Sequence, residues 1–238
     1  MKNSPKRTFP VWVDRKGMNT FSVILEELKL SKNMKLKNWD LALKNVERIK
    51  KIVPQYDKVN FFKGLIQYHR KNYRSAEESF ENYLSSQDGE KIFDPNDIAL
   101  MLDAYTDSIY QLGDYKKFQK VSSAILNDTR NFGAKNQLMT KVKEKISYLN
   151  LEVLAGSNQK GTEFLIVAKI KKFLEGHPKS AYRGRVQYLL GLALAEGKKE
   201  KEALKVFSDI LEDESISEYI KEMVKSELSL LKIKKQTI

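Results

Sequence analysis

The 238-residue sequence contains no cysteine. A chain without cysteine cannot form a disulfide framework, a thiolate zinc site or an iron–sulfur cluster, and it has no thiol nucleophile. Proline and glycine are also scarce, at five and eleven residues, whereas lysine, leucine, glutamate, alanine and isoleucine are frequent. That balance is typical of helices rather than of sheets joined by many tight turns. The composition therefore predicts an all-α fold.

Long apolar runs are absent as well. The first thirty residues hold no apolar stretch of about seven residues and no small-residue cleavage site, so no signal peptide is predicted. Nowhere does the sequence offer the roughly 18 consecutive apolar residues of a membrane-spanning helix. A lipid-anchored form would need a lipobox cysteine. We expect the chain as given to stay in the cytoplasm.

An internal repeat organises the chain. Residues 37–54 align without a gap with residues 71–88, so that aromatic, small and large apolar positions recur after 34 residues. Helix-turn-helix repeats are recognised by such a fixed period. The aligned pairs are Trp39 with Tyr73, Ala42 with Ala76, Val46 with Phe80, and Ile49 with Tyr83.

The second half of the chain repeats this pattern in residues 188–211. Gly64 precedes Ala76 by the same number of residues as Gly191 precedes Ala203. A glycine in the first helix lets the second helix approach closely, and the alanine accepts that contact from the other side. The repeated spacing predicts tightly packed helix hairpins.

The pattern resembles the tetratricopeptide repeat, in which an aromatic residue, an alanine three residues on and a large apolar residue four further precede a proline. The middle of the chain departs from it, with Phe118 and Ile166 where alanine is usual. Residues 176–191 (GHPKSAYRGRVQYLLG) also resemble a hairpin of bacterial envelope assembly lipoproteins of the same superfamily, over roughly one repeat. The general resemblance covers all but the ends of the chain.

This resemblance implies a right-handed superhelix of about five helix hairpins, closed at the C-terminus by a capping helix. An uncovered last hairpin would expose apolar surface to water. We expect a basic N-terminal arm at residues 1–18 and a tetratricopeptide-like α-solenoid at residues 19–238. The expected hairpins are at about 19–53, 55–87, 95–128, 132–177 and 180–213, and the capping helix is expected at 215–235.

Residues that could carry catalysis or bind a metal are few. His69 and His177 are the only histidines, and they fall in different predicted hairpins. Asp103 and Asp107 share a helix face, with Asp114 nearby, but the acidic loop pattern of calcium sites is missing. Neither a phosphate loop, a dinucleotide fingerprint nor a serine nucleophile elbow occurs. We expect no enzymatic activity, no cofactor and no metal.

With catalysis and metal binding set aside, the remaining candidate site is a surface for binding a partner. In the tetratricopeptide superfamily the first helix of each hairpin lines a concave groove that takes an extended or helical peptide of a partner protein. The alternative is that Phe61, Leu65 and Leu192 pack against neighbouring helices, because helical spacing alone does not separate the two. By resemblance, the candidate partner-binding residues are Lys58, Phe61, Leu65, Tyr68, His69, Asp103, Asp107, Tyr110, Arg185, Tyr188 and Leu192.

The net charge of +12 lies in the N-terminal third. Residues 1–75 hold 18 basic and 6 acidic side chains, and the remainder holds 25 of each. Such asymmetry bears on partners rather than on the fold, and it predicts a partner that is acidic where it meets this end. The candidate residues of the basic arm are Lys2, Lys6, Arg7, Trp12, Arg15 and Lys16.

The arm has more than one interpretation. Trp12 could cover the open end of the first hairpin, or the arm could become ordered on a partner. Basic and aromatic side chains also suit nucleic acid, because lysines release counterions and rings stack on bases. The sequence thus predicts a non-enzymatic scaffold or adaptor that binds a partner protein in a larger bacterial assembly. The alternative is binding of nucleic acid or an anionic surface by the N-terminal third.

Overall fold

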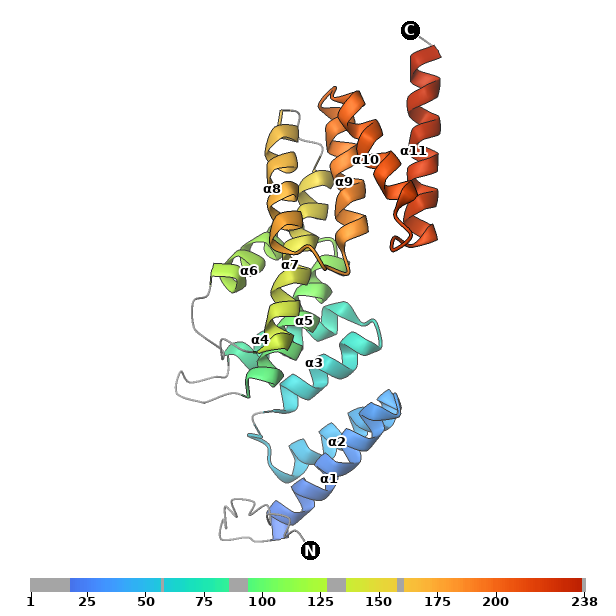
Figure 1. Ribbon diagram of the computed structural model, residues 1–238. Coiled ribbons are helices and arrows are strands. Elements are labelled where there is room, and N and C mark those ends of the chain that lie inside the picture. Colours follow the sequence, from blue (N-terminus) through green and yellow to red (C-terminus); the bar gives the residue numbers. More distant parts are fainter. Residues whose placement is uncertain (1–17, 57, 86–93, 128–135, 158–160, 237–238) are drawn as a thin grey trace, which may run out of the picture. The chain divides into compact units, whose positions relative to one another are not determined.

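The computed structural model describes residues 18–56, 58–85, 94–127, 136–157 and 161–236. Within these ranges all regular structure is helical and no strand occurs, which confirms the predicted all-α class (Figure 1). The helices are α1 (Met18–Lys35), α2 (Trp39–Ile52), α3 (Val59–His69), α4 (Tyr73–Ser85), α5 (Pro95–Gln111), α6 (Tyr115–Asn127), α7 (Gln137–Gly156), α8 (Glu163–Gly176), α9 (Arg183–Glu196), α10 (Glu200–Glu212) and α11 (Glu218–Gln236).

The chain divides into two compact units. The first ends at Asp94 and also takes in Asp107–Leu112, whereas the second consists of Pro95–Thr106 and of the residues from Gly113 onward. Helix α5 therefore contributes one segment to each unit.

The first unit is built from two helix hairpins. Helix α1 packs against α2, α3 packs against α4, and α2 joins the hairpins by packing against α3. Buried residues of α1, α2 and α3 form one core in which Leu30, Val46 and Ile49 meet Ile66. The shared core explains why apolar positions recur in both helices of the first hairpin and in α3.

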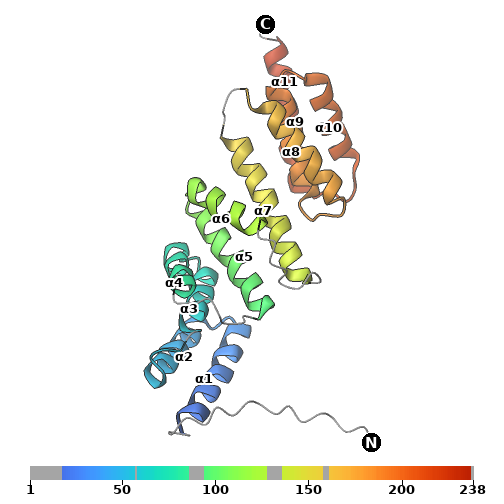
Figure 2. The same cartoon turned by 90° about the vertical axis from the view of Figure 1, so that its left-hand side faces the viewer.

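In the second unit, successive helices from α6 to α11 pack against one another (Figures 1 and 2). Helix α7 also contacts α9, and α11 contacts both α9 and α10. A core cluster near its start joins Ala99 of α5 to Ile125 of α6 and Val142 of α7. At its other end Ile216 and Val224 are buried, and Val224 lies within α11.

The α3–α4 and α9–α10 hairpins each contain the same kind of close helix crossing. A methyl group added at Gly64 would lie 2.5 Å from the Phe80 ring, and one added at Gly191 would lie 2.2 Å from the Phe207 ring. Both rings are fully buried, as are Ala76 and Ala203. The repeated glycine in the sequence therefore marks a contact between backbone and ring that leaves no room for a side chain.

In each of the five hairpins, a described residue two positions before the second helix lies in the left-handed region. At three turns that residue is a lysine, although only glycine adopts this conformation without strain. A backbone bond of the Schellman type closes these three turns, donated by Asn38, Asn72 and Lys199 over 2.8–2.9 Å. The φ angles are 58° at Lys37, 63° at Lys71, 72° at Gly113, 88° at Gly161 and 59° at Lys198.

Candidate functional site

The candidates on α3 divide between core and surface. Phe61 and Leu65 are only 2% and 8% exposed, and the Phe61 ring lies 5.6 Å from that of Tyr83 on α4. Lys58 is half-buried immediately before α3. Phe61 and Leu65 thus pack within the chain, which is the alternative to partner binding considered from the sequence.

His69 is exposed but not isolated. Its ring stacks on Trp39 of α2 with the centroids 4.7 Å apart and the planes 7° from parallel. Partial burial, and secondarily the positive charge of Lys37, lower the pKa of His69 below its usual 6.5. The histidine is therefore neutral at physiological pH and joins the two hairpins of the first unit.

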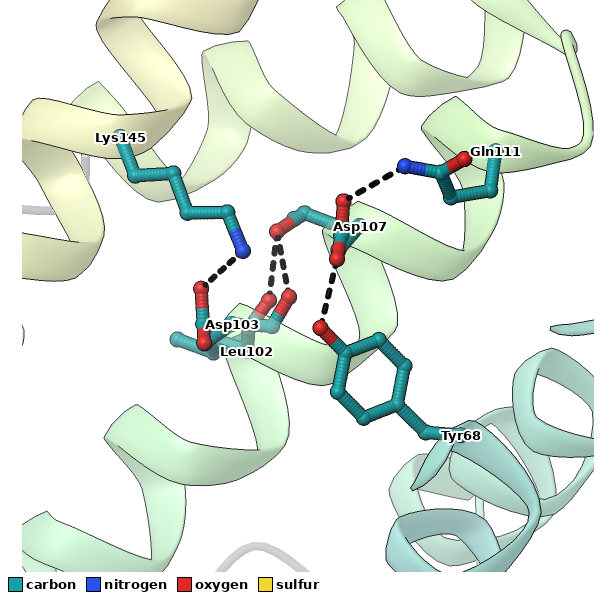
Figure 3. Close-up of polar contacts among 7 residues, drawn as sticks. Tyr68, Leu102, Asp103, Asp107, Gln111 and Lys145 are labelled. Atoms are coloured by element: carbon teal, nitrogen blue, oxygen red, sulfur yellow. Dashed lines mark hydrogen bonds and ion pairs between the residues drawn. The ribbon is translucent and has the colours of Figure 1, made fainter. Parts of the chain in front are cut away.

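Tyr68 binds a carboxylate within the first unit. Its hydroxyl donates to Asp107 Oδ2 over 2.6 Å, and the Gln111 amide donates to the other oxygen, Oδ1, over 3.5 Å (Figure 3). Tyr110, the neighbouring candidate, is half-buried on the same helix. Asp107 thus serves to hold the end of α5 against α3.

Asp103 has a different partner, within the second unit. Lys145 of α7 donates to its Oδ1 over 2.9 Å, and both side chains are partly exposed (Figure 3). The two aspartates that share a helix face are therefore engaged separately, one by a phenol and one by an ammonium group. Among the described residues no group of three or more histidine, aspartate or glutamate side chains could hold a metal ion.

The candidates on α9 connect it to its neighbours. Arg185 Nε donates to Glu152 of α7 over 3.1 Å, and the Tyr188 hydroxyl donates to Glu227 of α11 over 3.4 Å. Burial of Tyr188, together with the negative charge of Glu227, raises the pKa of its phenol to about 12, so that it stays protonated as a donor. Leu192 is half-buried. These contacts stabilise the packing of the second unit.

A groove that sequence reasoning missed lies on α8. Its volume is about 320 Å³, and the ring of Phe164 at its edge is 80% exposed. The sequence did hold an indication: α8 has more apolar residues than one face can bury, and only Ile166, Ile170 and Phe173 are buried. The groove is lined by Glu163, Phe164, Val167, Ala168 and Lys171 of α8, by Ala193 of α9, and by Gly197 and Lys199 of the turn that follows.

A buried carboxylate lies between α1 and α2. Glu26 is 7% exposed; Lys29 Nζ and Asn45 Nδ2 each donate to it over 2.7 Å, and Arg48 lies 3.6 Å away. The bond from Lys29, followed by that from Asn45, holds the pKa of Glu26 below its ordinary value of 4.5 against the opposing effect of burial. Asn33 completes the network by donating to Asn45 over 2.8 Å.

Acidification should therefore destabilise the first unit through Glu26. Because its folded pKa is depressed, the stabilisation is present above the unfolded value of 4.5 and is lost as the pH falls below it. We expect Glu26→Gln to lower the free energy of unfolding at neutral pH and to lose less stability between about pH 5 and pH 3 than the parent. Urea denaturation across this range measures both effects. Glu78→Gln, at an exposed site, is the matched control; equal pH dependence in the parent and both variants would contradict the prediction.

The candidates of the basic arm, Lys2, Lys6, Arg7, Trp12, Arg15 and Lys16, lie outside the described residues. The described helices include none with the length and apolar character needed to cross a bilayer. No protein-family model matches the sequence, and no curated protein is significantly similar to it.

Proposed function

We propose that this chain is a non-enzymatic, tetratricopeptide-like scaffold in the cytoplasm that binds a partner protein in a larger bacterial assembly. In this proposal its hairpins follow one another in a right-handed superhelix, with α11 as the capping helix. Support comes from the shared construction of the α3–α4 and α9–α10 hairpins. Each pairs a glycine with a buried phenylalanine ring and buries the matching alanine completely.

The observation that carries the binding function is the groove on α8. Its apolar lining and the exposed ring of Phe164 suit the side chains of a peptide, and about 320 Å³ is enough for a few anchoring residues rather than for a folded domain. The lining carries Glu163 as well as Lys171 and Lys199. Lys199 is already paired with Glu202 over 3.2 Å, whereas Lys171 is exposed. A peptide with apolar anchors, and with a carboxylate that meets Lys171, fits this chemistry.

The test is capture of the partner from the native host, followed by mass spectrometry and a measured affinity. Phe164→Asp should weaken binding roughly tenfold or more, because it removes an apolar contact at the edge of the groove. Leu230→Asp changes an exposed apolar side chain on α11, at 51% exposure, and should leave binding unchanged. Equal affinities of parent and Phe164→Asp would remove the groove as the binding site.

The response to salt separates this function from its alternative. Capture of an apolar peptide should change little with ionic strength, whereas a nucleic acid or another polyanion releases counterions and its affinity falls steeply. A steep loss between about 50 and 200 mM salt, with nucleic acid in the captured material, would favour the N-terminal third as a polyanion-binding surface.

A further inference from the structure

Helix α1 carries apolar residues on two opposite faces. Val23 and Leu30 point into the core of the first hairpin and are buried. On the other side a stripe with helical spacing is open to solvent: Phe21 is 70% exposed, Ile24 44%, Leu25 42% and Leu28 64%. A helix at the surface of a globular unit normally has one apolar face, so the second face needs a separate explanation.

The 34-residue repeat allows the exposed face of α1 to be compared with the equivalent residues of α3. Moving 34 residues along the chain takes Leu25 to Val59, Leu28 to Phe62 and Lys32 to Ile66 on α3. All three α3 residues pack against the core of the preceding hairpin, Val59 and Ile66 as buried members and Phe62 beside them. The stripe on α1 is thus the surface that an element preceding the first hairpin would cover, and a helix packs on this surface one repeat later.

The charge of the face limits what can bind there. After Leu28 the same side of α1 continues into Lys32 and Lys35, which are exposed and form no ion pair with the described residues. The acidic residues of α1 point elsewhere: Glu26 is buried against Asn45, and Glu27 accepts a hydrogen bond from Tyr56 of the α2–α3 turn. The outer face is therefore apolar in its first half and basic in its second half.

A second copy of the chain fits this face poorly. Two α1 helices packed in parallel would place Lys32 and Lys35 against the same lysines of the partner copy. Packed antiparallel, the helices would place them against Phe21 and Ile24, with no carboxylate to compensate the charge. Like charges brought together across an interface cost affinity, so the complementary occupant is acidic.

From this face we infer that α1 is a docking site for an amphipathic helix of a partner protein, with apolar residues at i, i+3, i+4 and i+7 and carboxylates at the end that meets Lys32 and Lys35. This rests on the proposed function as a protein-binding scaffold, and it adds a second surface and the chemistry of its ligand. Helix-in-groove recognition uses the same spacing of anchors. The partner helix takes the place on α1 that α2 takes on α3.

The experiment uses the full chain and a synthetic amphipathic helix with leucines at i, i+3, i+4 and i+7 and glutamates at one end, followed by fluorescence anisotropy. We expect saturable binding, weakened roughly tenfold or more by Leu28→Glu and also by Lys32→Glu combined with Lys35→Glu. Leu41→Glu, at a 50% exposed leucine of α2 in the same hairpin, should bind like the parent. A peptide with lysines in place of the glutamates should bind more weakly.

Other outcomes overturn the inference. One is the absence of saturable binding, and another is an equal loss for Leu41→Glu. The melting temperature of Leu28→Glu should match that of the parent, because the side chain is exposed. A marked drop would mean that another segment of the chain itself covers the stripe. A parent dimer that Leu28→Glu converts to a monomer would assign the face to a second copy. None of these results affects the groove at Phe164, which tests the scaffold function separately.

Discussion

Replacing Gly191 with alanine should lower the free energy of unfolding by about 2 kcal/mol. The added methyl group would lie 2.2 Å from the Phe207 ring, which is fully buried and cannot move aside without displacing its neighbours. Overpacking of this kind typically costs roughly 1–3 kcal/mol. Alanine returns at most about 1 kcal/mol through its higher helix propensity, so destabilisation prevails. Gly64→Ala should behave alike, because its methyl group would lie 2.5 Å from the Phe80 ring.

Gly176→Ala is the matched control. Gly176 is the last residue of α8, and a methyl group there would meet nothing within 4 Å. This variant should unfold at the same denaturant concentration as the parent or a higher one. In a double-mutant cycle, Phe207→Leu should cost less in the Gly191→Ala background than in the parent, because the smaller side chain relieves the clash. Chemical denaturation that showed Gly191→Ala as stable as Gly176→Ala would refute the close crossing.

Helix positions followed from the sequence wherever the repeat is strong. Trp39 and Tyr73, the aromatic residues 34 positions apart, are the first residues of α2 and α4. The reason is local, because an amphipathic pattern that repeats at a fixed period places the corresponding helix at the same position in each repeat. The left-handed conformation of Lys37, Lys71 and Lys198 could not be predicted from the sequence. A glycine at such a turn indicates this conformation, whereas a lysine does not.

The face that each apolar residue presents was harder to predict. Helical spacing identifies residues that share a side, but it does not say which side a neighbouring helix occupies. Phe61 is buried against α4, whereas Phe164 and Phe21 are largely exposed, although all three lie in apolar stretches of helix. The sequence could therefore identify these apolar residues, but it could not decide which of them are buried in the core and which are exposed for contact with a partner.

Polar contacts between distant residues lay beyond the sequence as well. Tyr68 and Asp107 are 39 residues apart, and Asp103 and Lys145 are 42 apart. Nothing in the local pattern distinguishes a carboxylate paired across helices from one that faces solvent. The sequence could place Asp103 and Asp107 on one helix face, but only the structure shows that Lys145 binds the first and Tyr68 the second.

Val224→Asp should be among the most damaging single changes, with an expected loss of roughly 3 kcal/mol or more in the free energy of unfolding. Val224 is fully buried in α11, which packs on α9 and α10. Aspartate there removes buried apolar surface and requires a carboxylate to lose its hydration without a designed partner. Ser226→Asp adds the same charge two residues away at an exposed position of the same helix and should change stability by no more than about 0.5 kcal/mol.

The manner in which Val224→Asp fails would show what α11 does. If α11 covers the end of the repeat, the variant should expose the α9 surface around Gly184, whose backbone approaches Ile216 and Ile220 so closely that a methyl group there would lie 3.1 Å from Ile216. Hydrogen exchange should then accelerate in α9 and α11 together, and light scattering should report aggregation at concentrations where Ser226→Asp stays monomeric. Removing residues 215–238 should reproduce this behaviour in stronger form. If Val224→Asp unfolded at the same denaturant concentration as Ser226→Asp and showed no added exchange in α9, the α9–α10 hairpin would be stable without α11, and α11 would then be available for a partner instead.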